Sequence, residues 1–274
     1  MVMKASWCGA ADVRTIPRIL YSFYERRLLR EIKRQPVPRH VGIILDGNRR
    51  HGRSIGVSDP QLIYELGARK LDDVLDWCAQ LKISAVTLWV LSTENLGRRP
   101  AEEISGIFAA IERKLASLAN DPQIHRRCVR VRAIGDLALV PERTLAVIRG
   151  TEEATRSYSS MDLSIAVAYG GRREIVAAVK SSLREMAAQG LDLSAAVERL
   201  TPDLIGKHLY TAELPDPDLI IRTSGEIRLS GFLLWQSVRS EFYFTDVNWP
   251  AFRFVDFLRR AIRAYQGRQR RFGM

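Results

Sequence analysis

The sequence predicts an α/β protein of a single domain, built on a central, mostly parallel sheet that is flanked by helices. Short and almost wholly apolar runs, which are typical of buried parallel strands, alternate with longer segments whose apolar residues recur three and four apart. This alternation predicts parallel strands with helices on both faces of the sheet. With 274 residues, 46% of them hydrophobic and 27% charged, the chain has the length and composition of a globular protein with one large core.

The expected strands are apolar runs that end at turn or polar residues. The run at residues 83–91 is the longest and is almost continuously apolar, so we expect it to be a central strand. The six runs lie at residues 41–45, 83–91, 128–134, 163–168, 219–221 and 242–244.

The expected helices are marked by apolar stripes and by proline. An amphipathic helix occupies the N-terminal arm, residues 1–36, and Pro36 and Pro38 end it because proline disfavours helix at and before its own position. Pro100 suits the first turn of a later helix, where the carboxylates of Glu102 and Glu103 are also favourable. Other helices are expected around residues 71–81, 104–118, 175–186, 201–203 and 254–265, and after Pro141.

The chain is basic, with 42 Lys and Arg against 31 Asp and Glu and a net charge of +11. This balance fits nucleic acid, an anionic membrane surface or a phosphorylated substrate. The three cysteines are odd in number and lack a CxxC spacing, which indicates a reducing compartment and no zinc site. No apolar segment is typical of a signal peptide or long enough to span a bilayer, so we expect a cytoplasmic protein that can contact a membrane surface peripherally.

Unusual polar residues follow five of the apolar runs. Because ligands of open α/β sheets bind beyond the carboxyl ends of the strands, we expect these residues to share one edge. Their carboxylates and arginines suit a metal with a phosphorylated ligand, since Mg²⁺ prefers oxygen ligands and guanidinium groups pair with phosphate oxygens. For the first segment an ordinary solvated Asp-Gly turn is the alternative. The five segments are 46–50, 92–95, 135–136, 169–173 and 222–228.

These segments belong to a series of separated motifs. The motifs are His40-Val-Gly-Ile-Ile-Leu-Asp46-Gly-Asn-Arg-Arg50, Leu91-Ser-Thr-Glu-Asn95, Ile134-Gly-Asp136, Tyr169-Gly-Gly-Arg172, Asp218-Leu-Ile-Ile-Arg222-Thr-Ser-Gly-Glu226, Phe232-Leu-Leu-Trp-Gln236, Glu241-Phe-Tyr-Phe-Thr-Asp246 and Arg270-Arg-Phe-Gly273. In this order the chain resembles the cis-prenyltransferases, the undecaprenyl diphosphate synthase family, from about His40 to Gly273. Several motifs in one order are far more specific than any one of them.

The resemblance implies a reaction and its partners. Isopentenyl diphosphate would be added head-to-tail to an allylic diphosphate, with a new cis double bond. Mg²⁺ would be the cofactor and would assist departure of the allylic diphosphate. The resemblance also implies a hydrophobic tunnel between helices, a homodimer, no nucleic acid, and a catalytic domain over residues 37–274.

Matching positions carry implied roles. Asp46 is the implied catalytic carboxylate and metal ligand, Glu241 the second metal ligand, and Asn95 the residue that helps to remove the proton. Contacts to the allylic diphosphate are implied for Gly47, Asn48, Arg49 and Arg50, with His51 beside them. Further substrate contacts are implied for Ser92, Thr93, Glu94 and Leu96, and isopentenyl diphosphate would be held by Arg98, Arg222, Arg228 and Ser230, with Leu229 beside them.

The sequence departs from the long-chain members of the family. His51 and Leu96 replace tryptophans, Arg99 is an extra residue, and Asp59 and Tyr64 fall near positions where those enzymes use Arg and His for the allylic diphosphate. An extra residue between Gly56 and Gly67, the stretch Leu-Ser-Thr-Glu-Asn-Leu at 91–96 and the stretch Arg-Leu-Ser-Gly-Phe-Leu-Leu-Trp-Gln-Ser at 228–237 resemble the short-chain Z-farnesyl diphosphate synthases. This resemblance predicts a short product, with a long-chain undecaprenyl-type synthase as the alternative. Residues that could end the tunnel, or simply pack the core, are Val90, Ile104, Ile107, Phe108 and Ile111.

Two other classes of function remain as alternatives. A basic nucleic-acid-binding module would explain the net charge, but it does not explain carboxylates gathered at strand ends. A non-catalytic partner subunit of the same fold would explain the resemblance. Such a subunit would be expected to lose Asp46 or Glu241, and the chain keeps both.

Overall fold

Six strands form one parallel sheet at the centre of the structure, a computed structural model that describes residues 18–267. Their order across the sheet is β3–β4–β2–β1–β5–β6, so β1 lies between β2 and β5. Ile44 is in register with Trp89 on one side and Arg222 on the other, and the segments that follow these residues therefore emerge side by side. The strands are β1 (His40–Ile44), β2 (Ala85–Trp89), β3 (Val129–Ile134), β4 (Met161–Ala166), β5 (Leu219–Arg222) and β6 (Glu241–Phe244).

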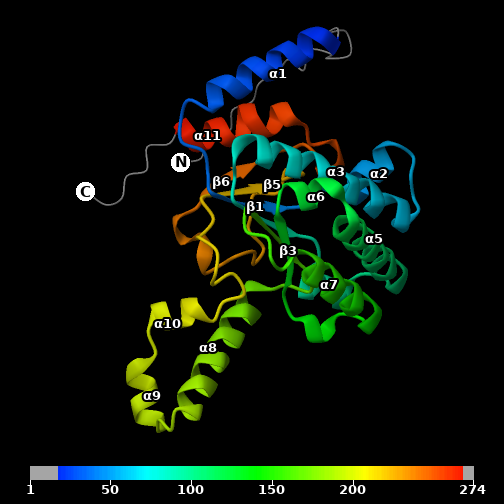
Figure 1. Ribbon diagram of the computed structural model, residues 1–274. Coiled ribbons are helices and arrows are strands. Elements are labelled where there is room, and N and C mark those ends of the chain that lie inside the picture. The colour runs from blue at the N-terminus through cyan, green and yellow to red at the C-terminus, as the bar shows by residue number, and fades with distance from the viewer. Residues whose placement is uncertain (1–17, 268–274) are drawn as a thin grey trace.

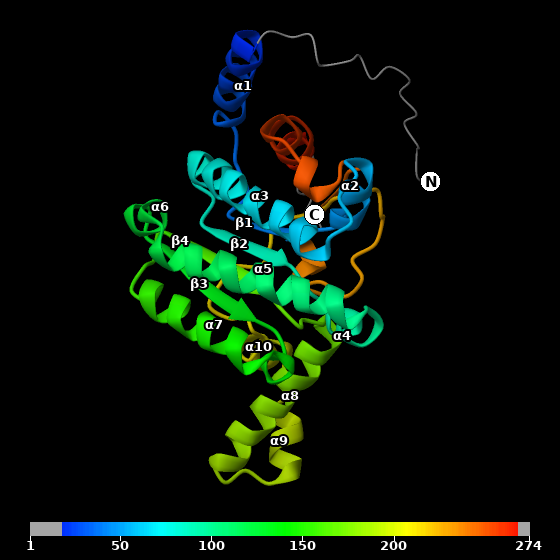
Figure 2. The same cartoon turned by 90° about the vertical axis from the view of Figure 1, so that its right-hand side faces the viewer.

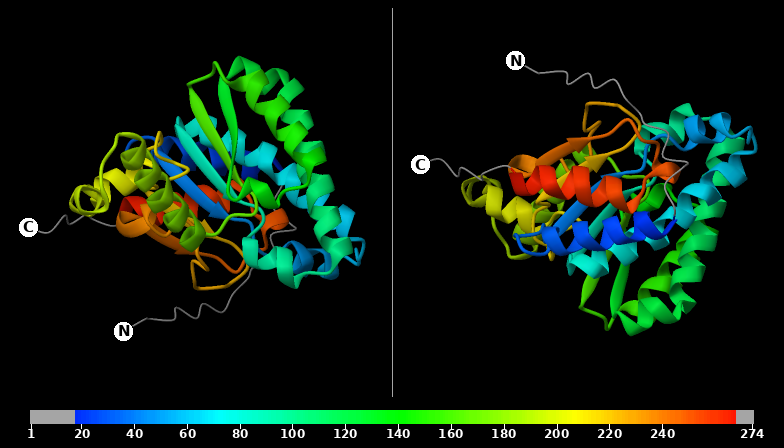
Figure 3. Two further views of the ribbon diagram at one scale, coloured as in Figure 1. Left: turned by 90° about the horizontal axis from the view of Figure 1, so that it is seen from below. Right: turned by 90° about the horizontal axis from the view of Figure 1, so that it is seen from above.

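Helices cover both faces of this sheet (Figures 1 and 2). Over one face α3, α5 and α7 lie next to one another, and the C-terminal helix shares their core, with Phe257 against Trp77 of α3, whereas Figure 3 shows α8 on the opposite side of the sheet. The N-terminal helix α1 packs on the C-terminal π-helix η5. The helices are α1 (Arg18–Ile32), α2 (Asn48–Ser54), α3 (Pro60–Leu81), α4 (Thr93–Arg98), α5 (Ala101–Asn120), α6 (Pro122–Arg126), α7 (Glu142–Thr155), α8 (Gly171–Ala188), α9 (Leu193–Arg199), α10 (Pro202–Lys207), η5 (Asp256–Ile262) and α11 (Arg263–Gly267).

Neighbouring residues of each strand face opposite sides of the sheet, and both sides are buried. Ile43 and Leu88 belong to the large core beneath α3 and α5. Ile44 and Trp89 join a smaller cluster on the other side, where Trp89 stacks on Phe232 with ring centroids 5.4 Å apart. Because helices or loops cover both faces of the central strands, β1, β2 and β5 are buried at every position, whereas the edge strand β3 alternates buried valines with the partly exposed Arg130 and Arg132.

The structure confirms the six predicted strands and the predicted parallel arrangement. It also contains α2, α4, α6 and α9, which the sequence did not predict and none of which exceeds seven residues. Helices this short show too few turns for an apolar period to be recognised. Two of them matter for function, because the segments 46–50 and 92–95, expected to be loops, contain the first turns of α2 and α4. Among residues 18–267 no helix is both long enough and apolar enough to cross a membrane.

His40, the first residue of β1, is buried and neutral. Its Nδ1 lies 2.6 Å from the carbonyl oxygen of Pro215, which can only accept a hydrogen bond, so Nδ1 carries the proton. Its Nε2 then accepts from the Thr87 hydroxyl at 2.9 Å. Burial lowers the pKa of His40 from 6.5 to about 4, because the charged ring would lose its hydration.

We expect acid to destabilise the fold through His40. Its pKa in the folded chain lies below the unfolded value, so the unfolded chain binds a proton first and stability falls as the pH drops from 6.5 towards about 4. The loss from this residue is on the order of 3 kcal/mol. Urea unfolding of the wild type and of His40→Gln across this pH range isolates the contribution, because the variant lacks the titrating ring. An imidazole of His40 that titrates near pH 6.5 in NMR spectra of the folded chain would contradict the expectation.

Candidate active site

Polar residues that follow β1, β2, β4 and β5 line one open cavity of about 740 Å³ at the carboxyl edge of the sheet. Eight of the lining residues are arginines and three are carboxylates, so the cavity attracts anions that carry several negative charges. The arginines are Arg49, Arg50, Arg98, Arg99, Arg172, Arg173, Arg222 and Arg228, and the carboxylates are Asp46, Glu94 and Glu226.

Asp46 follows β1 and is held by two hydrogen bonds. Its Oδ2 accepts from Arg222 Nη2 at 2.9 Å, and its Oδ1 accepts from the backbone N–H of Gly47 at 2.8 Å. The turn requires glycine at position 47, where φ is +98° and a Cβ would lie 2.4 Å from the amide oxygen of Asn248. The Asp46 side chain is still 31% exposed, so an anchored carboxylate reaches the cavity.

Arg222, at the end of β5, joins this carboxylate to the next loop. Its Nη1 donates to the carbonyl oxygen of Arg228 at 2.5 Å and to Ser230 Oγ at 2.8 Å, while Nη2 donates to Asp46. The side chain is only 6% exposed, and its Nε finds no partner in the part of the chain that the structure describes. One buried guanidinium therefore fixes the carboxylate of β1 and the fold of residues 223–230 together.

Glu226 holds two arginines at the rim of the cavity. It accepts from Arg50 Nη2 at 2.8 Å and from Arg228 through its other oxygen. The hydrogen bond from Arg50 and the charge of Arg228 lower the pKa of Glu226, so it stays ionised. Arg50 also donates to Ser224 Oγ at 2.6 Å. Both guanidinium groups are thus placed at the cavity before any anion binds.

A further group at the cavity was missed by sequence reasoning. Arg99 Nη1 donates to the Tyr64 hydroxyl at 2.6 Å and to Glu103 Oε1 at 2.9 Å, and the Tyr64 hydroxyl donates to the same Glu103 oxygen at 2.5 Å. Arg49 Nε lies 3.6 Å from that oxygen. Burial and the neighbouring Glu103 raise the pKa of Tyr64, which keeps its hydroxyl protonated. Only the fold brings Tyr64 to Arg99, since in the sequence Arg99 is distinguished only as an extra residue before Pro100.

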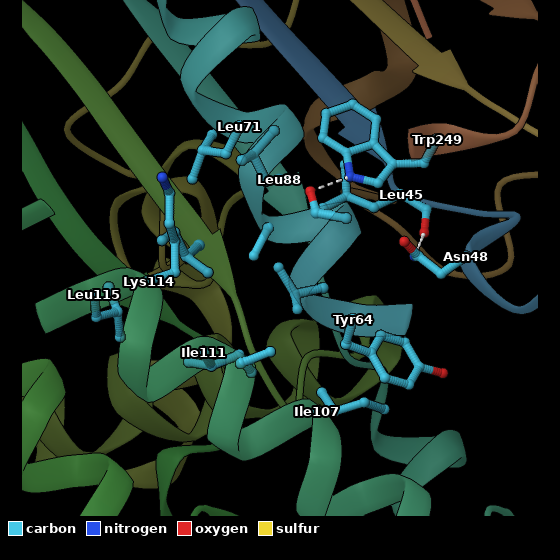
Figure 4. Close-up of a pocket in the computed structure, with 15 residues that line it drawn as sticks. Leu45, Asn48, Tyr64, Leu71, Leu88, Ile107, Ile111, Lys114, Leu115 and Trp249 are labelled. Atoms are coloured by element: carbon cyan, nitrogen blue, oxygen red, sulfur yellow. Dashed lines mark hydrogen bonds between the residues drawn. The ribbon is translucent and has the colours of Figure 1, made fainter. Parts of the chain in front are cut away.

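A second, narrow cavity of about 60 Å³ lies between α3 and α5 and adjoins the polar one (Figure 4). Leu45 and Val90 line both cavities, so they form the junction. Its walls are mainly aliphatic side chains from the two helices and the sheet. Trp249 closes one side, where its indole N–H donates to the Gly67 carbonyl at 2.8 Å. The pair of cavities thus offers one binding site for charge and one for hydrocarbon.

The structure shows which of the five residues that could end a tunnel, or simply pack the core, line the apolar cavity. Val90, Ile107 and Ile111 line the second cavity. Ile104 and Phe108 do not, and Phe108 is instead buried in the main core. The helical period places Phe108 on the apolar side of α5, but it cannot tell which apolar side chains face the cavity.

Most of the predicted site residues meet at the polar cavity, namely Asp46, Arg49, Arg50, Ser92, Glu94, Asn95, Arg98, Arg222, Arg228 and Ser230. Seven others do not line it: Gly47, Asn48, His51, Thr93, Leu96, Leu229 and Glu241. Asn48 lines the apolar cavity, and Leu96 and Leu229 pack against the two hydrophobic clusters. Arg172, Arg173 and Glu226, which belong to the segments expected at this edge, also line the cavity, and so does Arg99, to which no binding role was assigned. The motif at 270–273 and Cys8 lie outside the described residues.

Glu241 is not part of this cavity. It is the first residue of β6 and is level with Leu219 and Val41 across the sheet, whereas Asp46 follows the other end of β1. Asp46 lies five residues further along the strand direction than Val41, so it is roughly 16 Å from the level of Glu241. The expectation that Asp46 and Glu241 bind one metal is therefore wrong within a single chain, and a shared metal would need Glu241 from a second copy.

Asp46 fits a magnesium ion that shares its coordination with a bound phosphate. Mg²⁺ is commonly held by one or two carboxylates together with substrate phosphates and water. Each Asp46 oxygen accepts one hydrogen bond and keeps further acceptor capacity. Within residues 18–267 no three His, Cys, Asp or Glu side chains gather as a metal site, so phosphate oxygens, water or a residue of a second copy would supply the remaining ligands.

Comparisons with known proteins agree with this site. A family model described as "Putative undecaprenyl diphosphate synthase" matches residues 44–273. The chain is 56% identical to an isoprenyl transferase of Deinococcus radiodurans, over 96% of each chain. It is 52% identical to a (2Z,6E)-farnesyl diphosphate synthase of Thermobifida fusca, over 93% of this chain and 97% of that one. It is 49% identical to a tritrans,polycis-undecaprenyl-diphosphate synthase (geranylgeranyl-diphosphate specific) of Methanopyrus kandleri, over 95% and 94%.

A solved structure is similar as well. The crystal structure of lavandulyl diphosphate synthase from Lavandula x intermedia, in complex with dimethylallyl diphosphate, matches with a TM-score of 0.78 and 32% identity. The match covers 89% of this chain and 100% of that one. Sequence and fold therefore point to the same group of proteins.

Proposed function

The chain belongs to the undecaprenyl diphosphate synthase family, the cis-prenyltransferases, and from that premise we propose that it joins isopentenyl diphosphate to an allylic diphosphate in a Mg²⁺-dependent reaction with a short-chain product. It is an enzyme of prenyl chain condensation. We propose its substrates, its metal, its product length and the roles of single residues from the geometry of the site.

The observation that carries the proposal is the junction of the two cavities at Leu45 and Val90. An allylic diphosphate is an amphiphile, and its diphosphate would lie among arginines while its tail enters the apolar cavity. Arg49 and Arg50, on α2 beside the junction, and Arg99 would then bind the allylic diphosphate. Isopentenyl diphosphate has a much shorter hydrocarbon part, so it needs only the polar cavity.

Isopentenyl diphosphate would bind near the loop after β5. Arg228 and Ser230 line the cavity there, and Arg222 fixes the loop that carries both. Arginine pairs with two diphosphate oxygens at once through its planar fork, which lysine cannot do. The two diphosphates would thus lie on either side of Asp46, with their reacting carbons between them.

The reaction breaks the allylic carbon–oxygen bond, and the diphosphate leaves with the bonding electrons. The double bond of isopentenyl diphosphate forms the new carbon–carbon bond, and a proton is lost to give the new cis double bond. Arginines around the leaving group stabilise the charge that develops on it. Asn95, which lines the cavity, would assist removal of the proton, and Asp46 would hold Mg²⁺, which supplies further neutralisation of the diphosphate when bound.

Two other features complete the proposal. A homodimer is the expected assembly, and it is also the assembly in which Glu241 of a second copy could approach Asp46. A cytoplasmic location is proposed from the sequence, whose cysteine usage favours a reducing compartment.

The proposed function is tested by supplying labelled isopentenyl diphosphate and Mg²⁺ with each of dimethylallyl, geranyl and farnesyl diphosphate. We expect label to enter a short cis-prenyl diphosphate with at least one of these primers, and only when Mg²⁺ is present. No incorporation with any primer would overturn the proposal, and a long-chain product would overturn its statement on product length.

We expect Asp46→Asn to lower turnover about a hundredfold or more, because the site loses the charge that would hold the metal beside the leaving group. The amide keeps an acceptor for Arg222, so the fold should be retained. Asp136→Ala is the matched control, since its side chain is 33% exposed and pairs with Arg173 but does not line the polar cavity. Near-normal turnover of Asp46→Asn at saturating Mg²⁺ would refute the role of Asp46.

Replacing Arg228 by Lys should raise the KM for isopentenyl diphosphate and leave the KM for the allylic substrate nearly unchanged, because charge is kept and the bidentate fork is lost. Arg222→Lys should raise the same KM and also lower kcat, because Asp46 loses its partner. Steady-state kinetics with each substrate varied in turn gives both constants. An unchanged KM for isopentenyl diphosphate in both variants would contradict this part of the proposal.

Val90→Ala should lengthen the product, since it opens volume at the junction where a growing tail must enter. Phe108→Ala is the control, because it removes a buried side chain of α5 that does not line the cavity. The control should lose about 3–5 kcal/mol of stability without making longer products. The products of both variants are sized by chromatography, and equal lengths in wild type and Val90→Ala would speak against the role of Val90.

A further inference from the structure

Among residues 18–267, Lys114 is the one charged residue that lines the apolar cavity. The other lining residues near it, Leu71, Ile111 and Leu115, are aliphatic. A lysine at this position needs a partner for its charge, because an ammonium group that faces hydrocarbon loses the free energy of its hydration.

An ion pair across the two helices explains how the lysine is tolerated. Lys114 comes from α5, and its Nζ forms an ion pair with Asp72 of α3. The Lys114 side chain is only 12% exposed, while that of Asp72 is 53% exposed. The aliphatic stem therefore lies against the cavity and the ammonium group reaches an acidic partner at the surface, as long basic side chains often do.

The Lys114–Asp72 pair lies at the end of the apolar cavity that is farther from the junction with the polar cavity. In Figure 4 Lys114, Leu71 and Leu115 lie on one side of the cavity, opposite Asn48, Tyr64 and Leu45. Leu45 is one of the two residues at the junction with the polar cavity. From Ile107 to Leu115 the helix α5 rises roughly 12 Å, which gives the scale of the path from one end to the other.

We propose that Lys114, held by Asp72, closes the far end of the apolar cavity and so limits the length of the prenyl chain. The inference rests on the proposed function and names the feature that ends chain growth. A tail that grew beyond Leu71 and Leu115 would have to displace the lysine stem. It would then either break the ion pair or place the ammonium group against hydrocarbon, and neither is favourable.

The chain offers a matched control in Lys70. Its Nζ pairs with Asp73 at 2.6 Å within α3, and its side chain is 17% exposed, close to the value for Lys114. Lys70 does not line the cavity. The two pairs therefore differ in whether they close the space between the helices, and Lys70 Nζ also lies 5.8 Å from the centre of the Trp77 ring.

The test compares Lys114→Ala and Asp72→Asn with Lys70→Ala and Asp73→Asn. With the primer that the wild type uses best, we expect the first two variants to give products at least one isoprene unit longer, and the control variants to give the wild-type length. The rate of the first condensation should stay within about twofold of wild type in all four, because none of the four residues lines the polar cavity. Unchanged product length in folded, active Lys114→Ala, or equal lengthening in Lys70→Ala, would overturn the inference.

A binding measurement separates this inference from the proposed function. Prenyl diphosphates of increasing chain length are titrated into the wild type and Lys114→Ala without isopentenyl diphosphate. We expect affinity to fall beyond a certain length in the wild type and to be retained at that length in the variant. If the wild type condenses no substrate, the proposed function fails, and the binding series still decides whether Lys114 limits the length of chain that fits. Identical length dependence in both proteins would refute the closure.

Discussion

The ion pair between Asp46 and Arg222 is the contact on which the site depends. It connects the ends of β1 and β5, and the same guanidinium group holds the loop that carries Arg228 and Ser230. Because Arg222 is almost fully buried, a change that left its guanidinium group without an acceptor at position 46 would destabilise the fold. The parallel sheet makes the pair possible, since neighbouring strands end at one edge.

The architecture at this edge of the sheet also explains why charged and aliphatic side chains line separate cavities. Loops after the strands supply arginines, while α3 and α5 on the face of the sheet supply aliphatic side chains. Leu45 and Val90 directly follow β1 and β2 and border both regions. An amphiphilic substrate can therefore be held with its reacting carbon at the border, where diphosphate and tail meet. If Lys114 and Asp72 close the apolar region, the packing of α3 against α5 sets the length of that region.

The sequence was sufficient for the fold and for much of the site, and particular residues show why. Asp46 and Arg222 each follow a recognisable apolar run, and parallel strands bring such ends together. Glu241 precedes its run, so strand direction already placed it at the opposite edge, although the motif suggested a shared metal. The network of Arg99, Tyr64 and Glu103 joins residues up to 39 positions apart, and no local pattern predicts such contacts.

The most direct measurement is a crystal structure of the chain with Mg²⁺ and an unreactive allylic diphosphate analogue whose bridging oxygen is replaced by sulfur. The account predicts the diphosphate beside Asp46, Arg49 and Arg50, and the tail past Leu45 and Val90 towards Lys114. A tail that lies outside the space between α3 and α5, or a diphosphate away from Asp46, would contradict it.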